Sequence, residues 1–529
     1  MYYVIGSGPA GVACAHALLE AGKIVTMLDA GLRLEPERKN VVDEMARNSP
    51  DRWRPDWHAF IREGMAATKE GVPFKRLFGS DFPYRETDRH LPADGENIGL
   101  RPSLAQGGLS NVWGAAMLPY SERDLRGWPL RAADLEAHYA AVVRLTGLAG
   151  QHDDLAAFAP LYTDTPSSLR LSRQAERLMA HLQRHRSSLA RDGWHFGHSR
   201  LAVAGTNNTS NFGCVYCGTC MYGCPYGYIY NSAATLARLR MDPNFSYQPD
   251  VIVETVAETG GEVLIRGFDR VSGAPRQWHA ERVFSAGGPI PTTRLLLWSQ
   301  QAFGRRVQLR DSQYFLFPFL LPSGDSNPEQ ERLHTLSQIF VELMDDLTDQ
   351  HTVHAQLYTY NDLWAGAVES AFPFHNAISR AFARMTARRL GIVQSYLHSD
   401  HSSRIGVELT APVSGQPPRL RLKAEINPEA RRRARQIAWK FTREARRFGA
   451  LAVPPLLQIT PVGRGHHTGG SFPMRLQPVE FETDLLGRPA GWQRVHAVDA
   501  TVFPNIPATT ITLSVMANAH RIGTAAAQL

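Results

Sequence analysis

Apolar runs and one glycine-rich turn in the first thirty residues predict a strand, a helix and a second strand. Apolar residues predominate in 2–5 and in 24–29, which ends at Asp29, and those of 12–21 recur with helical spacing. The turn Gly-Ser-Gly-Pro-Ala-Gly stands between the first run and the helix. Each element has the length that a βαβ unit requires, so a parallel sheet is expected to begin here.

Further helices and strands are predicted along the chain, and the pattern changes from that of a parallel sheet to that of an antiparallel sheet at about residue 306. Helices are expected at 132–145, 167–185, 233–240, 292–298, 371–389 and 512–526, and strands at 251–256, 262–268, 282–284, 352–360 and 394–398. The strands of 251–285 lead into a glycine turn and a helix, which predicts a return to the parallel layer. Residues 306–420 alternate polar and aromatic positions, as a mainly antiparallel sheet over a cavity does. Residues 35–100 show weak periodicity and are expected to run over the surface.

These patterns predict an α/β fold with two domains. Residues 1–305 are expected to form a Rossmann-type nucleotide-binding domain, with the surface segment inserted in it and a cysteine-rich loop at 214–224. Residues 306–455 are expected to form mainly a substrate domain on a mainly antiparallel sheet. Residues 456–529 are expected to return to the first domain, which is then assembled from several chain segments.

Composition excludes several classes of protein. Of the 529 residues, 43% are hydrophobic and 20% are charged, and the 43 Gly and 34 Pro are scattered, which excludes collagen-like, mucin-like and wholly disordered chains. No apolar run approaches the roughly 20 residues of a membrane span, and no export signal is recognised. We expect a cytoplasmic protein without a membrane span, with co-export by a signal-bearing partner left open.

The basic excess, 57 against 50 acidic residues, is concentrated in residues 431–447. Ile437, Ala438 and Phe441 give this segment an apolar side, so an amphipathic helix with a solvated arginine face is expected. Contact with an acidic surface is the alternative. No nucleic-acid-binding signature accompanies the segment, and no nucleic-acid partner is expected.

The glycine turn has the chemistry of a dinucleotide site. Gly6 permits the tight bend, Gly8 lets the backbone approach a pyrophosphate, and Gly11 lets helix and strand pack closely. The helix N-terminus presents free N–H groups to phosphates. Asp29, at the end of the second strand, is placed for a ribose hydroxyl pair. Either FAD or NAD satisfies these features.

Five segments resemble, in order, the flavoproteins of the glucose-methanol-choline (GMC) oxidoreductase family: 4–31, 107–114, 128–135, 285–297 and 467–504. Gly107-Gly108-Leu109-Ser110-Asn111-Val112-Trp113-Gly114 looks like the segment along the flavin ring, and His467-Thr468-Gly469-Gly470-Ser471 looks like the C-terminal signature. The resemblance implies FAD as cofactor. The FAD-binding residues it implies are Gly6, Ser7, Gly8, Pro9, Ala10, Gly11, Asp29, Gly107, Gly108, Ser110, Asn111, Trp113, Gly114, Val253, Ala286, Gly287, Asp499, Ala500, Thr510 and Ile511.

The resemblance also implies oxidation of a CH–OH group, with the hydride going to flavin N5 and the hydroxyl proton to His467 as base. An imidazole suits this role because its ordinary pKa lies near working pH. The chain departs from the family at Thr510, where a second His or an Asn is usual, and at Ile511, where Pro is usual. Thr510 can hydrogen-bond a substrate oxygen but cannot share its proton at neutral pH, so His467 is expected to be the sole base.

Four of the five cysteines, Cys214, Cys217, Cys220 and Cys224, fall within eleven residues. Their spacing is that of bacterial ferredoxin runs, so they are candidate ligands of one iron-sulfur cluster. Some GMC dehydrogenases of sugars and polyols carry such a cluster, which implies an electron-acceptor protein or quinone as partner. A cluster-free structural loop is the alternative. Zinc is disfavoured because its ligands usually come in two separated pairs, and disulfides are disfavoured without an export signal.

The expected substrate is a secondary alcohol of a sugar, polyol or glycoside. Two alternatives remain: an oxygen-using oxidase of a hydrophobic or sterol-like alcohol, and a non-catalytic electron-transfer flavoprotein, for which Thr510 argues. His354, Tyr358, His398 and His401 are candidates for lining the substrate cavity, with surface or core roles as the alternative for each.

Overall fold

The computed structural model describes the chain except residues 66–73, 207–211, 323–326, 347–348, 372–375 and 414–415. Its longer helices are α1 (Pro9–Glu20), α2 (Pro36–Arg47), α3 (Pro55–Arg62), α5 (Glu136–Thr146), α6 (Arg173–Arg184), α7 (Arg186–Arg191), α8 (Ser232–Leu239), α9 (Pro289–Ser299), α10 (Asp362–Ala371), α11 (Ala377–Ala387), α12 (Pro428–Arg443) and α14 (Thr512–Ala526). Single-turn helices are α4 (Thr87–His90) and α13 (Ala445–Phe448). Several sheets complete an α/β fold.

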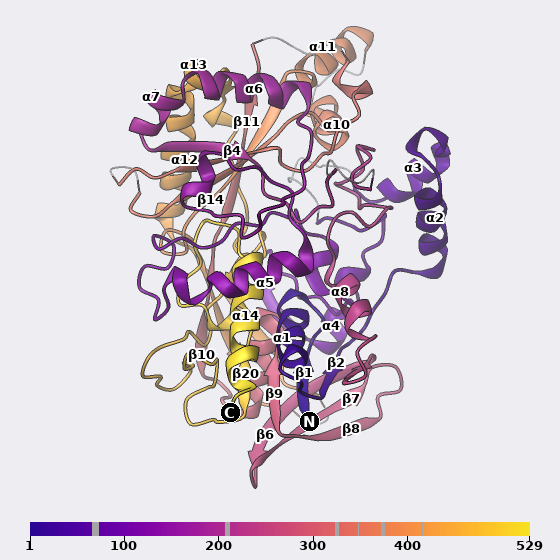
Figure 1. Cartoon of the computed structure of the whole chain (residues 1–529), viewed down its shortest axis with the longest axis vertical. Helices are drawn as coiled ribbons and strands as arrows, with labels where there is room; N and C mark the ends of the chain where they lie inside the picture. Colours follow the sequence, from indigo (N-terminus) through magenta and orange to yellow (C-terminus); the bar gives the residue numbers. More distant parts are fainter. Residues whose placement is uncertain (66–73, 207–211, 323–326, 347–348, 372–375, 414–415) are drawn as a thin grey trace.

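A five-stranded parallel sheet, in the order β20-β9-β1-β2-β5, lies in the lower part of the view in Figure 1. Its strands are β1 (Tyr2–Ile5), β2 (Val25–Leu28), β5 (Phe245–Gln248), β9 (Arg282–Ser285) and β20 (Val495–Ala497). The strand, helix and strand predicted at the start of the chain are therefore confirmed. Segments far apart in sequence complete the layer, because β9 pairs directly with β1 and β20 pairs with β9.

Helix α14 packs against α1 beside this sheet, and both chain ends lie close together in Figure 1. A Cβ atom at Gly523 would lie 3.0 Å from the carbonyl oxygen of Cys14 and 3.2 Å from the Cβ of Ala17. The two helices therefore come this close because position 523 has no side chain. The C-terminal segment is thereby held against the first βαβ unit.

The second large sheet is antiparallel, in the order β17-β11-β14-β13-β12-β4 with β18 beside β11. Its strands are β4 (Trp194–His198), β11 (Tyr314–Leu320), β12 (Ile339–Leu343), β13 (Val353–Tyr358), β14 (Leu390–Tyr396), β17 (Leu451–Ala452) and β18 (Gln458–Ile459). In β11, Phe315 and Phe317 face a core shared with α6 and α12, while Tyr314 faces a cavity on the opposite side. The antiparallel sheet with one face over a cavity is as predicted.

A third sheet is mixed, in the order β19-β10-β15-β16-β3. Its strands are β3 (Ala93–Glu96), β10 (Arg306–Asp311), β15 (Arg404–Leu409), β16 (Leu420–Glu425) and β19 (Thr468–Gly469). β10 pairs Asp311 with Thr468, and the Ser312 amide donates to the His467 carbonyl at 2.8 Å. This pairing fixes the backbone beside the predicted catalytic histidine.

Some element predictions were wrong. β6 (Val251–Thr259), β7 (Glu262–Asp269) and β8 (Pro275–Ala280) form a separate antiparallel sheet, so only β9 returns to the parallel layer. The reason is local, because Gly260 and Gly261 turn the chain at positive φ and pair β6 with its neighbour. The helix expected from residue 167 begins only at Arg173, where the Ser172 hydroxyl caps it.

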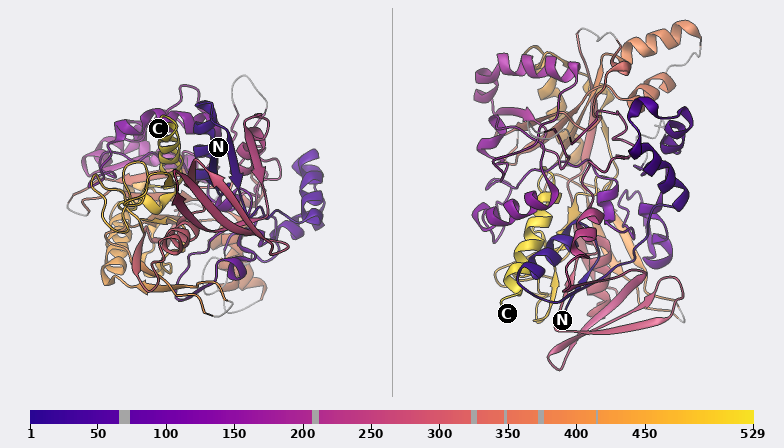
Figure 2. Two further views of the ribbon diagram at one scale, coloured as in Figure 1. Left: turned by 90° about the horizontal axis from the view of Figure 1, so that it is seen from below. Right: turned by 45° about the vertical axis from the view of Figure 1, so that its right-hand side comes forward.

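The surface differs between the sides of the molecule. Helices α2 and α3, drawn in indigo, stand at one side in Figure 2, and Trp53 between them stacks on Tyr226, two residues after the cysteine-rich loop.

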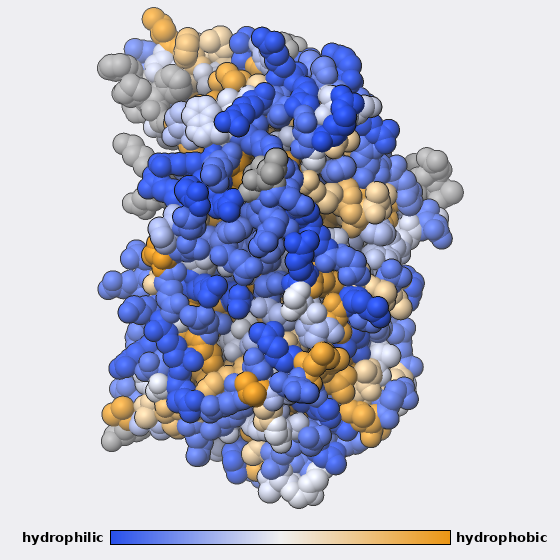
Figure 3. Space-filling view, turned by 90° about the vertical axis from the view of Figure 1, so that its left-hand side faces the viewer, coloured by the Kyte–Doolittle hydropathy of each residue, from blue (hydrophilic) through white to orange (hydrophobic). Residues whose placement is uncertain are grey.

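The face in Figure 3 is mainly hydrophilic, with hydrophobic residues in scattered patches. Among the described helices, none is long and apolar enough to cross a bilayer.

Replacing Phe441 tests the core behind the antiparallel sheet. Its buried ring lies 4.8 Å from that of Trp194 and 5.5 Å from that of Phe317, centroid to centroid. We expect Phe441→Ala to lower the free energy of unfolding by about 3–5 kcal/mol. Trp439→Ala, on the exposed side of α12, is the matched control and is expected to change it by about 0.5 kcal/mol or less. Urea denaturation measures both, and equal losses would contradict this packing.

Candidate active site

The glycine turn after β1 has the geometry of a dinucleotide cradle. Gly6 has a φ of +98°, and a Cβ there would lie 2.8 Å from the Ala286 carbonyl oxygen. A Cβ at Gly11 would overlap the Gly6 carbonyl oxygen, so both positions require glycine for packing alone. Gly8 is different, because a Cβ there would meet no atom within 4 Å. The space over Gly8 lies beside the free N–H groups of the first turn of α1 and can admit a phosphate.

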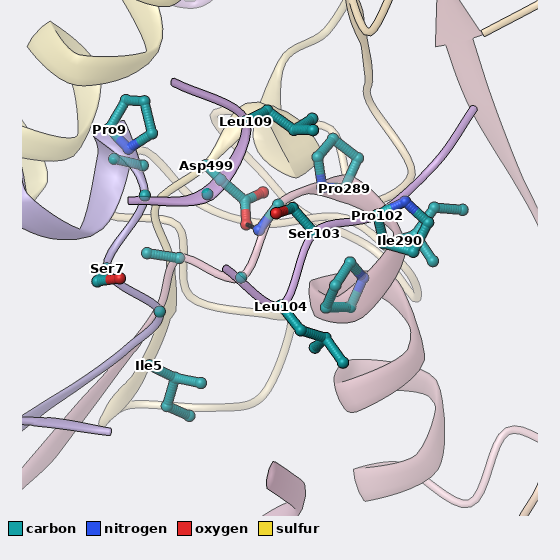
Figure 4. A pocket seen from close by; sticks show the side chains of 18 of the residues that line it. Ile5, Ser7, Pro9, Pro102, Ser103, Leu104, Leu109, Pro289, Ile290 and Asp499 are labelled. Atoms are coloured by element: carbon teal, nitrogen blue, oxygen red, sulfur yellow. Dashed lines mark hydrogen bonds between the residues drawn. The ribbon is translucent and has the colours of Figure 1, made fainter. Parts of the chain in front are cut away.

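Most of the predicted FAD-binding residues line one cavity, which we call the glycine-loop cavity (Figure 4). They are Gly6, Ser7, Gly8, Pro9, Ala10, Asp29, Gly108, Val253, Ala286, Gly287, Asp499, Ala500 and Ile511. Figure 4 shows Ser7 and Pro9 from the first turn and Asp499 from the C-terminal segment around the same space. The tertiary structure thus brings together residues from both ends of the chain.

Three other predicted residues, Gly107, Ser110 and Asn111, support this wall through hydrogen bonds. The Gly107 amide donates to the Ser7 hydroxyl at 2.9 Å, and the Ser110 hydroxyl donates to the Gly107 carbonyl at 2.6 Å. The Asn231 side-chain amide donates to the Asn111 side-chain oxygen at 2.6 Å. Asn231 was not predicted, and its only signal in the sequence is its position as N-cap of α8.

The two carboxylates in the wall are already hydrogen-bonded to the protein. Asp29 accepts from the Ser7 amide at 3.1 Å, the Ser7 hydroxyl at 2.7 Å and the Tyr247 hydroxyl at 2.9 Å. Asp499 accepts from the Gly288 amide at 2.8 Å and also from Thr292. Burial raises the pKa of both carboxyls. Asp29 therefore stabilises the glycine turn through its hydrogen bonds with Ser7, and its contact with a ribose stays a prediction.

A second cavity, which we call the histidine cavity, continues from the first. The two share Pro9, Leu109, His466, Ile511 and Thr512. Predicted residues that line the histidine cavity are Ser110, Trp113, Gly114, His467, Thr510 and Ile511. Facing them are the side chains of Tyr314, Gln356, Tyr358, Gln394 and Tyr396 from the antiparallel sheet. The two cavities therefore adjoin one another.

His467 lies in this space with its imidazole stacked on Tyr396, the ring centroids 4.7 Å apart. Its Nδ1 is buried without a hydrogen-bond partner. Burial, reinforced by the neighbouring imidazoles of His354 and His466, lowers the pKa of His467 to about 3. The ring is therefore neutral and able to accept a proton. Thr510 accepts a hydrogen bond from the Leu118 amide at 3.2 Å through its hydroxyl oxygen.

Of the other cavity candidates, only Tyr358 lines the histidine cavity. His354 is fully buried beneath it, 2.6 Å from a Glu342 oxygen through Nδ1. His398 and His401 lie instead in a polar cluster at the end of β14, where His401 pairs with Asp349 at 3.1 Å. His354 is on the same face of β13 as Gln356 and Tyr358 but nearer the start of the strand, and His398 and His401 come after the end of β14.

Lys75 and Arg464 line the histidine cavity, and no carboxylate does so among the described lining residues. The Lys75 ammonium donates to the Trp113 carbonyl at 3.1 Å. Burial lowers the pKa of Lys75 to about 8, although the thiols of Cys220 and Cys224 act to raise it. The prediction that residues 35–100 run over the surface is wrong in part, because Met45 and Ile61 are fully buried and Lys75 lines a cavity. The weak periodicity of the segment gives no signal of this burial.

Cys214, Cys217, Cys220 and Cys224 all line one small third cavity, which we call the thiol cavity. The rest of its wall is mostly apolar and includes Ile229, Leu336 and the buried His334. The Tyr228 amide points at the Cys224 sulfur at 3.3 Å. All five cysteines are free. Burial, with mutual repulsion among the thiolates, raises the pKa of Cys214 and of Cys224 to about 12.

The spacing of these sulfurs bears on the kind of metal they can hold. Four thiolates on one Zn²⁺ at about 2.3 Å would lie about 3.8 Å apart. Among the described residues, no three cysteine sulfurs lie within 4.8 Å of one another. The described thiols therefore do not converge on a single ion, and the iron-sulfur cluster stays a prediction.

Comparison with known proteins supports the fold. No protein-family model and no curated protein sequence matches the chain. The crystal structure of pyridoxine 4-oxidase from Mesorbium loti matches with a TM-score of 0.58 and 14% sequence identity, over 99% of this chain and 98% of that chain. The chain shares the fold of this oxidase along almost its whole length.

Gly8 and Gly11 offer a matched pair of variants. Gly8→Ala is expected to keep the parent's stability without ligand, because its methyl group enters open space, but to lose most binding of added FAD. Gly11→Ala is expected to destabilise the protein itself, because its methyl group overlaps the Gly6 carbonyl. Thermal unfolding with and without FAD measures both effects. A Gly8→Ala protein that binds FAD as tightly as the parent would refute the cradle.

Proposed function

We propose that the protein is an FAD-dependent oxidoreductase that oxidises a CH–OH group, with His467 as the base. The main support for this proposal is a pair of adjoining cavities, one at the glycine turn and one lined by the partly buried imidazole of His467 and a polar sheet face. The shared fold of an oxidase supports it.

The residues present fit FAD. The open space over Gly8 accommodates a pyrophosphate at the N-terminus of α1. The segment with Ser110, Trp113 and Gly114 lines the histidine cavity, where a flat ring system would lie between it and His467. When bound, FAD supplies the acceptor for the hydride of the substrate carbon.

The chain's own residues would supply the base and the orientation. Burial makes an imidazolium at His467 costly, so the ring can hold a proton only beside an anion such as the alkoxide that forms when the hydroxyl ionises. Tyr396 holds the ring by stacking. Thr510, which lines the same cavity, would donate a hydrogen bond to the substrate oxygen without competing for the proton.

We further propose a sugar, polyol or glycoside as the substrate. The sheet presents the amides of Gln356 and Gln394 and the hydroxyls of Tyr314, Tyr358 and Tyr396 to the cavity. Such a set of donors and acceptors matches a molecule with several hydroxyl groups, because each buried hydroxyl requires a partner. Some of these groups already pair with one another, because the Tyr358 hydroxyl donates to Gln356 at 3.0 Å and the Gln394 amide donates to the Tyr396 hydroxyl at 2.6 Å. Their remaining donors and acceptors favour a polar substrate, and the oxidase of hydrophobic alcohols stays the alternative.

We also propose that the four thiols of the thiol cavity hold one iron-sulfur cluster. Four free thiols with ferredoxin-like spacing surround one apolar space, and Leu336 borders both this space and the histidine cavity. A cluster there would accept single electrons and pass them to an external protein or quinone. No step of alcohol oxidation at His467 depends on it.

Replacing His467 tests the base. We expect His467→Ala to retain FAD but to reduce the rate of anaerobic flavin bleaching by a polyol or sugar by about 10²–10⁴-fold. His279→Ala, at an exposed strand position, is the control and should match the parent. Stopped-flow absorbance gives the rate. An unchanged rate in His467→Ala would remove the residue from this role, and bleaching by a low-potential donor alone would favour an electron-transfer flavoprotein.

Iron and acid-labile sulfide per FAD, in protein purified without oxygen, test the cluster. We expect several iron atoms with matching sulfide in the parent and a loss of both in Cys217→Ser. Cys14→Ser is the control, because Cys14 lies in α1 away from the thiol cavity, and it should keep the iron. Flavin without iron would make the loop structural and would favour an oxygen-using oxidase, which hydrogen peroxide release would reveal.

A further inference from the structure

Two histidines and a glutamate come together where α1 packs against α14 (Figure 1). His16 and Glu20 stand four residues apart on α1, so their side chains lie on the same face of the helix. His520 comes from α14. The His16 Nδ1 and the His520 Nε2 each lie 3.3 Å from the same Glu20 oxygen, Oε2. The three residues can therefore direct one nitrogen or oxygen atom each toward a common point.

Hydrogen bonds do not account for this arrangement. The His16 Nδ1 and the His520 Nε2 are buried and lack a hydrogen-bond partner among the described residues. Their 3.3 Å distances to Glu20 are longer than the usual 2.9–3.0 Å of an N–H···O hydrogen bond. Two ligands bound at about 2.1 Å to one tetrahedral ion lie about 3.4 Å apart. The observed separations thus suit shared coordination better than direct hydrogen bonding.

The second ring nitrogen of His520 is held by a neighbouring helix. Its Nδ1 lies 2.9 Å from the Nδ1 of His138 on α5. Histidines that bind metals usually donate from their other ring nitrogen to a neighbouring acceptor, which fixes the tautomer and the orientation of the ring. With the proton of His520 on Nδ1, the lone pair of Nε2 faces Glu20. His520 is only 6% exposed, so its ring is also fixed by packing.

From this geometry we infer that His16, Glu20 and His520 form a binding site for one Zn²⁺ ion. Two imidazoles, one carboxylate and a water molecule are a ligand set with which proteins bind zinc. The Glu20 side chain is 54% exposed, so water can reach the fourth position from the solvent side. In the described part of the structure, neither a lysine nor an arginine forms an ion pair with Glu20.

The ion would join the first long helix of the chain to the last. α1 begins at Pro9 and α14 at Thr512, and both of these residues line the glycine-loop cavity and the histidine cavity. None of the three proposed ligands is among the described lining residues of either cavity. The role of the ion is therefore structural, since an ion bound by the folded chain stabilises the packing of α1 on α14. The site does not depend on the proposed oxidation.

Calorimetric titration of Zn²⁺ tests the site, in full-length protein loaded with FAD and freed of metal by dialysis against EDTA. We expect the parent to show a binding event that is at least 100-fold weaker in Glu20→Gln and in His520→Ala, because a direct ligand is lost. His138→Phe should weaken it about 10–100-fold, as loss of a partner that orients a ligand does. His401→Ala is the matched control, because His401 belongs to a separate group of histidines and aspartates, and it should bind zinc like the parent.

Thermal unfolding supplies a second measurement. Zinc at 100 times its dissociation constant should raise the folding equilibrium constant of the parent about 100-fold and leave that of Glu20→Gln unchanged. Equal zinc affinity in the parent and in Glu20→Gln would overturn the inference.

Two further outcomes would also overturn it. Binding that requires millimolar zinc would indicate an adventitious ion only, and loss of binding in His401→Ala alone would place the ion at the group of Asp349, His351 and His401. If His520→Ala does not fold, Glu20→Gln still decides, because its side chain is more than half exposed and its replacement leaves no cavity.

Discussion

Contact between backbones without intervening side chains is the constraint on which the rest of the structure depends. Gly6 lies against the Ala286 carbonyl, and a Cβ at Gly108 would lie 3.2 Å from the Cα of Gly8. Three segments far apart in sequence thus meet at one point. Because side chains are absent there, the strands and α1 can close together and still leave room for a ligand over Gly8.

The second property of the site is its electrostatics. Burial keeps the His467 imidazole neutral, and two cations line the same cavity without a carboxylate among the described lining residues. Such a cavity disfavours additional positive charge and favours negative charge that develops during a reaction. The polar sheet opposite adds hydrogen-bond donors and acceptors without adding formal charge, so it can orient an alcohol while the imidazole takes its proton.

Much of the fold was predictable because its signals are local. The elements 2–5 and 512–526 were predicted with the bounds that the structure has, since long apolar periodicity and a glycine turn specify them directly. β6 and β7 were misplaced because an apolar run does not show which sheet it joins. Which strands pair depends on packing between distant segments, and the local sequence of a strand does not show its partner.

The sequence alone determined the glycine turn, the ferredoxin-like spacing of Cys214 to Cys224 and the position of His467 beside a glycine-rich stretch. These features need only neighbouring residues, so the order of the chain is enough to reveal them. Only the tertiary structure decided that His398 and His401 lie away from the cavity and that Lys75 lines it. Burial and the approach of distant charges depend on how the sheets close over one another, which is a property of the packed chain and not of any one segment.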